Sequence, residues 1–167
     1  MDSTRQRYLD KRSIAGPWQI TGIKRSDYSG AIVIPACDEE KWIFRTLNSL
    51  ANNPADLREN FLILVVVNHP ADTDRSIKMA NRRTLEEFTA SPLRKKLQLG
   101  WVDACSESYE LAEGGVGSAR KLGFDLALTR LRSEGDAILV SLDADTLVEP
   151  NYLEKILQHF SVSSAGG

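Results

Sequence analysis

The chain contains seven consecutive apolar residues, Phe61-Leu62-Ile63-Leu64-Val65-Val66-Val67, and this run decides the fold. A strand that is apolar at every position, rather than at alternate positions, is typical of a parallel sheet covered by helices on both faces. A second short run, Ala31-Ile32-Val33-Ile34, is rich in β-branched residues and ends at Pro35. Both runs are therefore predicted to be buried strands of an α/β protein.

Helical patterns alternate with strand patterns along the chain. One helix is predicted after Asp38, which could cap it, and before Asn52-Asn53-Pro54, which would stop it. Its apolar residues share one face: Ile43, Leu47, Leu50 and Ala51. The later elements are a weaker helix to about residue 90, a strand over 97–102, a helix over 115–132, a strand over 137–142 and a last helix opened by Pro150. This alternation predicts a mostly parallel sheet flanked by helices, whose ligands bind beyond the carboxyl ends of the strands.

Composition and charge are typical of one globular domain and do not indicate a nucleic-acid partner. The chain has 167 residues, of which 42% are hydrophobic and 26% charged, and its formal net charge is −2. No apolar stretch approaches the roughly 18–20 residues that span a bilayer, and residues 1–12 lack the apolar run of a secretory signal. We therefore expect a soluble cytoplasmic protein with no nucleic-acid partner and no membrane span.

The pattern divides the chain into three segments. Residues 1–29 are polar and irregular and are expected to form an N-terminal arm with little regular structure. Residues 30–160 are expected to form the domain, and the small residues of 161–167 a flexible tail. Cys37 lies among apolar residues after a strand, so we expect it to be a buried free thiol, which favours a reducing compartment.

The strongest chemical motif follows the strand over residues 137–142. It is Val140-Ser141-Leu142-Asp143-Ala144-Asp145-Thr146, in which an apolar strand delivers two carboxylates to the ligand edge of the sheet. Carboxylate oxygens suit a hard divalent cation, and a cation that also contacts a diphosphate neutralises much of its charge. One alternative is a solvated acidic turn in which Asp145 caps the last helix. Another is the Asp-x-Asp-x-Thr motif of haloacid-dehalogenase-type phosphatases, but there the motif opens the fold, whereas here it lies near the end of the chain.

Three short blocks of sequence follow one another along the chain. They are Ile32-Val33-Ile34-Pro35-Ala36-Cys37-Asp38-Glu39-Glu40, then Gly117-Ser118-Ala119-Arg120-Lys121-Leu122-Gly123, then Asp143-Ala144-Asp145 with Glu149-Pro150-Asn151-Tyr152-Leu153. In order and spacing they resemble the Val-Ile-Pro-Ala-Tyr-Asn-Glu-Glu, Gly-x-Ala-Arg-Asn-x-Gly and Asp-Ala-Asp blocks of family 2 glycosyltransferases. The resemblance extends over residues 30–160. It implies a Rossmann-like, nucleotide-sugar-binding half of a GT-A fold.

The resemblance also implies roles for the matching positions. Pro35, Ala36 and Glu39 would line the base and ribose of a nucleoside diphosphate sugar. Arg120 would lie near the base or diphosphate, where a guanidinium suits phosphate oxygens. Asp143 would hold the ribose or a metal-bound water, and Asp145 would ligate Mg²⁺ or Mn²⁺. The implied nucleotide-sugar site comprises Pro35, Ala36, Cys37, Glu39, Asn68, Arg120 and Asp143, with Asp145 and Asp143 at the metal.

The implied reaction is metal-dependent transfer of a sugar to an acceptor hydroxyl, with inversion. Relatives continue into a half that binds the acceptor and supplies the base. The catalytic base is therefore expected beyond residue 167, and the acceptor is unknown. A non-catalytic nucleotide-sugar-binding module is the alternative for the chain as given.

The segment after the second strand departs from the family pattern. Relatives carry Asp-Asp-Gly-Ser there, whereas this chain has Val67-Asn68-His69-Pro70. Because Asn68 can both donate and accept, it could still face a base edge, and we expect a UDP-sugar, with a GDP-sugar as the alternative. His69 could reach a phosphate or be a loop histidine without a role. Gly115-Val116-Gly117 lacks the third glycine of a dinucleotide loop and is interpreted as a flexible turn that lets a helix N-terminus approach the ligand.

Overall fold

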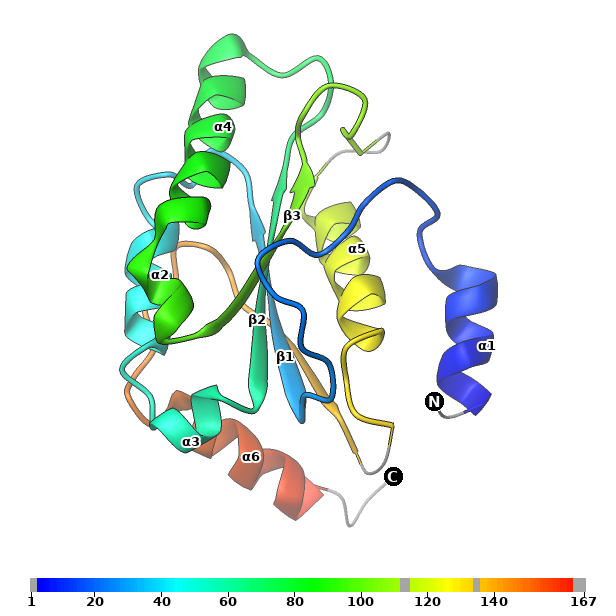
Figure 1. Cartoon of the computed structure of the whole chain (residues 1–167), viewed down its shortest axis with the longest axis vertical. Helices are drawn as coiled ribbons and strands as arrows, with labels where there is room; N and C mark the ends of the chain where they lie inside the picture. The colour runs from blue at the N-terminus through cyan, green and yellow to red at the C-terminus, as the bar shows by residue number, and fades with distance from the viewer. Residues whose placement is uncertain (1–2, 112–114, 134–135, 164–167) are drawn as a thin grey trace.

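A computed structural model describes residues 3–111, 115–133 and 136–163 and confirms the parallel α/β fold. In this part of the chain four strands form one sheet in the order β3-β2-β1-β4, and all neighbouring strands are parallel (Figure 1). The strands are β1 (Gly30–Ala36), β2 (Phe61–Asn68), β3 (Gln98–Ala104) and β4 (Ile138–Ser141). After β3 the chain returns to the far side of β1. The strand order therefore reverses between β1 and β4, which is where ligands of such sheets bind.

Helices cover both faces of the sheet. α2 (Ile43–Leu50) and α4 (Arg75–Ala90) lie on one face and α5 (Val116–Leu128) on the other (Figure 1). Residues of β2 alternate between two apolar clusters: Ile63 and Val65 pack with α2 and α4, whereas Leu64 and Val66 pack with α5. Every residue of β2 is buried, which explains why its sequence is apolar almost throughout.

Helix α5 packs close against the middle of the sheet. A Cβ atom at Gly123 would lie 2.3 Å from Cγ1 of Val33 on β1 and 3.0 Å from Cγ2 of Val66 on β2. A larger residue would push the helix away from the strands, so glycine permits this approach. The N-terminus of α5 is held in this way beside the carboxyl ends of β1 and β2.

Several element boundaries differ from those expected. α2 begins at Ile43, and Asp38 does not cap it. Asp38 instead has a φ of 61° and donates its N–H to the side chain of Asn81. The last helix, α6 (Tyr152–Ser163), begins after Pro150 rather than at it, and its last residues take up part of the expected flexible tail. Residues 164–167 lie outside the described residues, and two short helices, α3 (Ala55–Arg58) and η1 (Pro92–Lys95), were not predicted.

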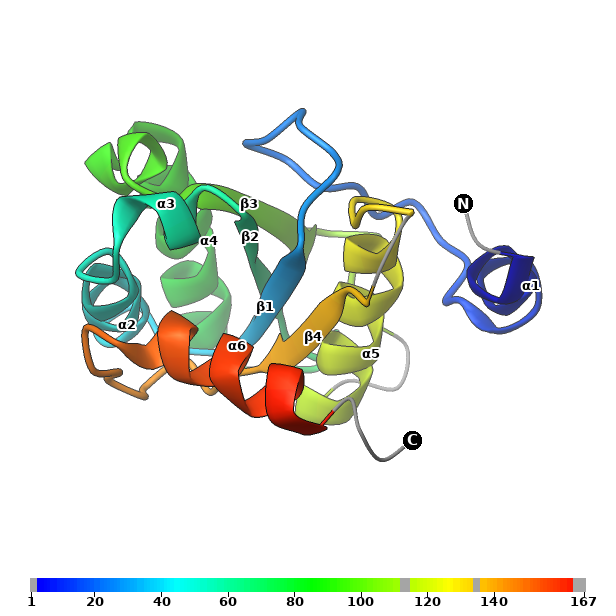
Figure 2. The same cartoon turned by 90° about the horizontal axis from the view of Figure 1, so that it is seen from below.

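The N-terminal segment has more structure than the sequence indicated. α1 (Ser3–Arg12) lies beyond α5, on the side away from the sheet (Figures 1 and 2). The buried carboxylate of Asp125 on α5 accepts hydrogen bonds from the Tyr8 hydroxyl at 2.9 Å and the Ile14 N–H at 2.8 Å. The expectation of little regular structure was wrong for residues 3–12, because polar anchors rather than an apolar face hold this helix.

Within the described residues, no helix combines the length and the apolar character that crossing a membrane requires.

Candidate functional site

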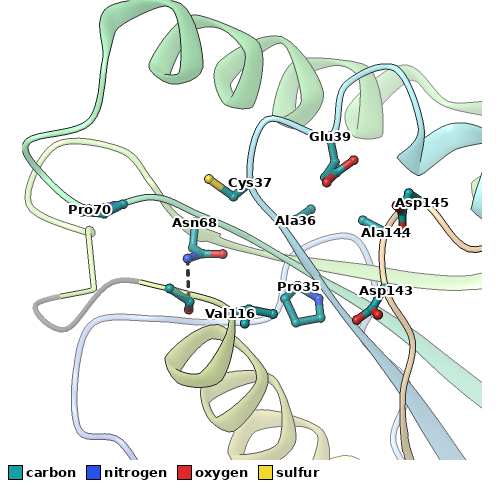
Figure 3. A pocket seen from close by; sticks show the side chains of 11 residues that line it. Pro35, Ala36, Cys37, Glu39, Asn68, Pro70, Val116, Asp143, Ala144 and Asp145 are labelled. Atoms are coloured by element: carbon teal, nitrogen blue, oxygen red, sulfur yellow. Dashed lines mark hydrogen bonds between the residues drawn. The ribbon is translucent and has the colours of Figure 1, made fainter.

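A pocket of about 360 Å³ opens at the carboxyl ends of β1, β2 and β4, where the strand order reverses. Most of the residues that the sequence assigned to a nucleotide-sugar site meet there (Figure 3). The pocket is lined by Pro35, Ala36, Cys37, Glu39, Asn68, Pro70, Gly115, Val116, Asp143, Ala144 and Asp145. These residues come from four segments that are far apart in the sequence. The geometry follows from the parallel sheet, which brings all its strand ends to one edge.

Three carboxylates give this pocket negative charge. Asp143 and Asp145 follow β4, and Glu39 follows β1. Burial raises the pKa of Glu39, and the negative charges of Asp145 and Asp38 raise it further. Among the residues that the structure describes, no three His, Cys, Asp or Glu side chains are grouped so that they could hold a metal ion by themselves.

Arg120 does not line the pocket, but it reaches one of its carboxylates. From α5 its Nε donates to Ser141 Oγ at 2.6 Å, and its Nη2 lies 3.4 Å from Asp143 Oδ1. The side chain of Asp143 is 69% exposed, so this ion pair is screened by water and holds the aspartate only loosely. The arrangement leaves both charged groups available to a ligand.

Polar side chains of α2 and the turn after it fix the backbone that carries the two aspartates. The buried Thr46 hydroxyl donates to the carbonyl of Ala144, between Asp143 and Asp145, at 2.7 Å. Further along the same segment, Ser49 Oγ accepts the Val148 N–H at 3.1 Å. Asn53 Oδ1 accepts the Leu153 N–H at 2.9 Å. Sequence reasoning missed these residues, although the position of Thr46 on the buried, apolar side of α2 was a usable signal.

Asn68, the last residue of β2, and His69, which follows it, differ in whether they line the pocket. Asn68 lines it, and its Nδ2 lies 3.5 Å from the carbonyl oxygen of Gly115, at the limit of a hydrogen bond. His69 is buried, and its Nδ1 lies 2.8 Å from the carbonyl oxygen of Pro70. The structure therefore does not place His69 where it would reach a phosphate in this pocket.

The glycine-rich turn before α5 forms one wall of the pocket. Gly115 has a φ of 112°, which other residues rarely adopt, and it stands at the N-cap of α5. Gly115 and Val116 both line the pocket, so the helix N-terminus faces it as predicted. Gly114 lies outside the described residues.

Cys37 is exposed, and the expectation of a buried thiol was wrong. β1 ends at Ala36, so the next side chain already lies at the pocket rather than in the core. Although the residue is exposed, partial desolvation of its sulfur raises the pKa of the Cys37 thiol, and the charges of Asp38 and Glu39 raise it further. The group is therefore a neutral thiol at neutral pH and a poor nucleophile.

Comparison with known proteins identifies the family. Residues 31–166 match the family described as Glycosyl transferase family 2. The chain belongs to this family. Membership of glycosyl transferase family 2 confirms the resemblance predicted from the three sequence blocks, and it removes the dehalogenase-type phosphatase as an explanation of Asp143-Ala144-Asp145-Thr146. The sequence matches no curated protein.

Solved structures of S. aureus TarS are similar to this glycosyl transferase family 2 chain. TarS 1-349 matches with a TM-score of 0.49 and 19% identity, over 81% of this chain and 33% of that chain. The same fragment in complex with UDP-GlcNAc matches with a TM-score of 0.49 and 21% identity, over 81% of this chain and 32% of that chain. The chain thus spans about one third of the length of TarS 1-349.

Proposed function

We propose that the pocket binds the nucleoside diphosphate part of a sugar nucleotide and that the protein transfers the sugar to an acceptor hydroxyl. The observation that carries this proposal is the convergence of Asp143, Asp145 and Arg120 beside the N-terminus of α5. Membership of glycosyl transferase family 2 supports it. The pocket also lies at the reversal of strand order, where parallel sheets bind nucleotides.

The diphosphate is proposed to lie between α5 and the end of β4. The first N–H groups of a helix lack partners within the helix and favour an anion. Arg120 adds a full positive charge in a planar fork that suits phosphate oxygens. Its Nε is bonded to Ser141, and its loose pairing with Asp143 leaves the Nη atoms available to the ligand.

The nucleoside is proposed to lie against Pro35, Ala36 and Cys37, with Asn68 at the edge of the base. The amide of Asn68 offers a donor and an acceptor side by side, which can pair with the N–H and carbonyl of uracil. We propose a UDP-sugar as the donor, with a GDP-sugar as the second candidate, because guanine also presents an N–H beside a carbonyl.

Mg²⁺ or Mn²⁺ is proposed as the cofactor, held by Asp145 and Asp143. The donor set fits, since hard cations of this kind are often bound by one or two carboxylates together with substrate phosphates rather than by a closed cage of protein ligands. After burial, the negative charges of Asp145 and Asp38 raise the pKa of Glu39, and a cation would offset these charges. When bound, the cation would supply neutralising charge to the departing nucleoside diphosphate.

The transfer itself is proposed to invert the anomeric carbon. The acceptor oxygen forms a bond to that carbon from the face opposite the diphosphate, the bond to the diphosphate oxygen breaks, and the hydroxyl proton passes to a base. The residues of this pocket contribute by binding and orienting the donor, which lowers the entropic part of the barrier.

Thermal unfolding with nucleotides tests the proposal. UDP with Mn²⁺ is expected to stabilise the chain by about 2.7 kcal/mol at a concentration one hundred times its Kd, and more than GDP or CDP does. D145N is expected to abolish the Mn²⁺-dependent part of this shift. D136N, which changes an exposed carboxylate before the other end of β4, serves as the matched control and is expected to keep it. Absence of a shift with all three nucleotides, with and without Mn²⁺, would overturn the assignment.

Transfer is measured separately, as release of UDP from a UDP-sugar in the presence of acceptor.

A further inference from the structure

Asn81 is a buried polar residue on α4 that does not line the pocket. It is 1% exposed, and its side-chain amide makes two hydrogen bonds to backbone atoms outside its own helix. Its Oδ1 accepts the N–H of Asp38 at 2.9 Å, and its Nδ2 donates to the carbonyl oxygen of Asn68 at 3.0 Å. One side chain therefore ties the loop after β1 to the end of β2.

Both backbone groups held by Asn81 lie in segments that form the wall of the pocket. Asp38 stands between Cys37 and Glu39, which both line the pocket, and Asn68 lines it directly (Figure 3). Asp38 has a φ of 61°, a left-handed conformation that a residue with a side chain keeps only when its surroundings hold it. The bond from its N–H to Asn81 is such a restraint.

We propose that Asn81 is a positioning residue that sets the distance between the two sides of the nucleoside end of the pocket. This inference rests on the proposed function, since it assigns a role at the nucleotide site. If the two walls of the pocket are already fixed, less of the binding free energy is spent on ordering them. The two hydrogen bonds of Asn81 therefore increase the affinity for the nucleotide, although Asn81 does not contact it. The role needs an amide, because one group must accept from Asp38 and the other must donate to Asn68.

Helix α4, which carries Asn81, also supplies a residue for a matched control variant. Thr84 is also 1% exposed and lies about one turn further along the same helix. Its Oγ1 donates to Ala80 within α4 at 3.0 Å, and it has no side-chain bond to the described residues of the pocket loops. T84V removes one buried hydrogen bond and N81L removes two. Only N81L frees the backbone groups of Asp38 and Asn68.

Two measurements on the full chain test the inference. Hydrogen–deuterium exchange of the Asp38 amide is expected to be at least about tenfold faster in N81L than in the wild type and unchanged in T84V. Titration calorimetry is expected to show that the Kd for UDP rises about tenfold or more in N81L and stays within about twofold in T84V. Unchanged exchange at Asp38 in N81L, or an equal loss of UDP affinity in T84V, would overturn the role of Asn81.

N81D gives a second route in case N81L does not fold. It keeps an acceptor for the Asp38 N–H and loses the donor to Asn68, so the Asp38 amide is expected to stay protected while UDP affinity falls. Wild-type affinity in N81D would contradict the inference. Failure of the wild type to bind UDP would instead overturn the proposed function, and the exchange result would still decide whether Asn81 holds the loop after β1.

Discussion

Glu39 and Glu40 are adjacent residues whose carboxyl groups the fold affects in opposite directions. Burial and the charges of Asp145 and Asp38 raise the pKa of Glu39, whereas the hydrogen bond from Arg83 lowers the pKa of Glu40. A raised carboxyl pKa means that the folded chain holds the proton more tightly than the unfolded chain. Glu39 therefore removes stability as pH rises above its ordinary pKa of 4.5. Glu40 contributes stability that is fully present above 4.5 and is lost as pH falls through its lowered folded pKa.

The opposite pKa shifts predict that removing each charge changes stability at neutral pH in opposite directions. E39Q is expected to raise the midpoint of urea unfolding at neutral pH and to leave it unchanged near pH 3, where the wild-type carboxyl is protonated in both states. E40Q is expected to lower the midpoint at neutral pH, because it removes the partner of Arg83. A lower midpoint for E39Q at neutral pH would show that the negative potential inferred for this pocket is absent.

At the scale of elements, α2 acts as a support for the segment that carries the two aspartates. The chain between β4 and α6 runs alongside α2 (Figures 1 and 2), and the hydrogen bond from Thr46 to Ala144 joins the two. Because Thr46 is fully buried, the Ala144 carbonyl has no solvent to replace this donor if it is removed.

T46V tests this support while keeping the shape of the side chain. It is expected to lower the free energy of unfolding by about 1–3 kcal/mol, the cost of leaving a buried polar group unpaired. It is also expected to weaken Mn²⁺-dependent binding of UDP, since Asp143 and Asp145 flank the released carbonyl. T84V, equally buried but bonded only within α4, is expected to lose stability without this loss of binding. Equal metal-dependent affinity in T46V and the wild type would show that α2 supports the fold and not the site.

The sequence predicted the strands better than it predicted how the helices begin. β1 and β2 are short, β-branched or apolar runs, and burial on both faces leaves little alternative for such a run. The start of α2 was misplaced because Asp38 has the residue type of a cap but donates its N–H to Asn81, which lies 43 positions later. A cap is judged from local sequence, and a contact over that separation is not visible there. α1 was missed for the same reason, since its anchor is Asp125 on another helix.

At the scale of the whole molecule, the pocket was predictable because a parallel sheet brings all strand ends to one edge. That rule points to the ends of all four strands, and Pro35, Asn68 and Asp143 do line the pocket, whereas residues 103–105 at the end of β3 do not. The rule gives no information about the buried hydrogen bonds behind the pocket, because Thr46 and Asn81 carry no charge and do not lie at a strand end. The tertiary structure was needed to find the residues that position the site.

The N-terminal segment gives the last prediction, which concerns how much of the chain the fold requires. Tyr28 is fully buried in the cluster on the α5 side of the sheet. Further side chains from this segment pack against the same cluster: Ile14, Trp18, Ile20 and Ile23. Thr21 also pairs with Trp101 on β3 through backbone hydrogen bonds of 2.8 and 3.0 Å. Residues 13–29 therefore contribute to the core, through Tyr28 and the partly buried side chains packed beside it, and do not form a detachable arm.

Removal of residues 1–29 is expected to destabilise the chain severely. Burial of one large apolar side chain contributes about 1.5–3 kcal/mol, and a domain has only about 5–15 kcal/mol of stability in total. Removal of residues 1–12 alone leaves these side chains in place and takes away α1 with its bond to Asp125, so we expect a smaller loss of about 1–3 kcal/mol. Urea unfolding of the two shortened chains beside the full chain measures both losses. If the chain that begins at Gly30 unfolded at the wild-type midpoint, the N-terminal segment would be an appendage, and its contacts with the sheet would contribute nothing to the fold.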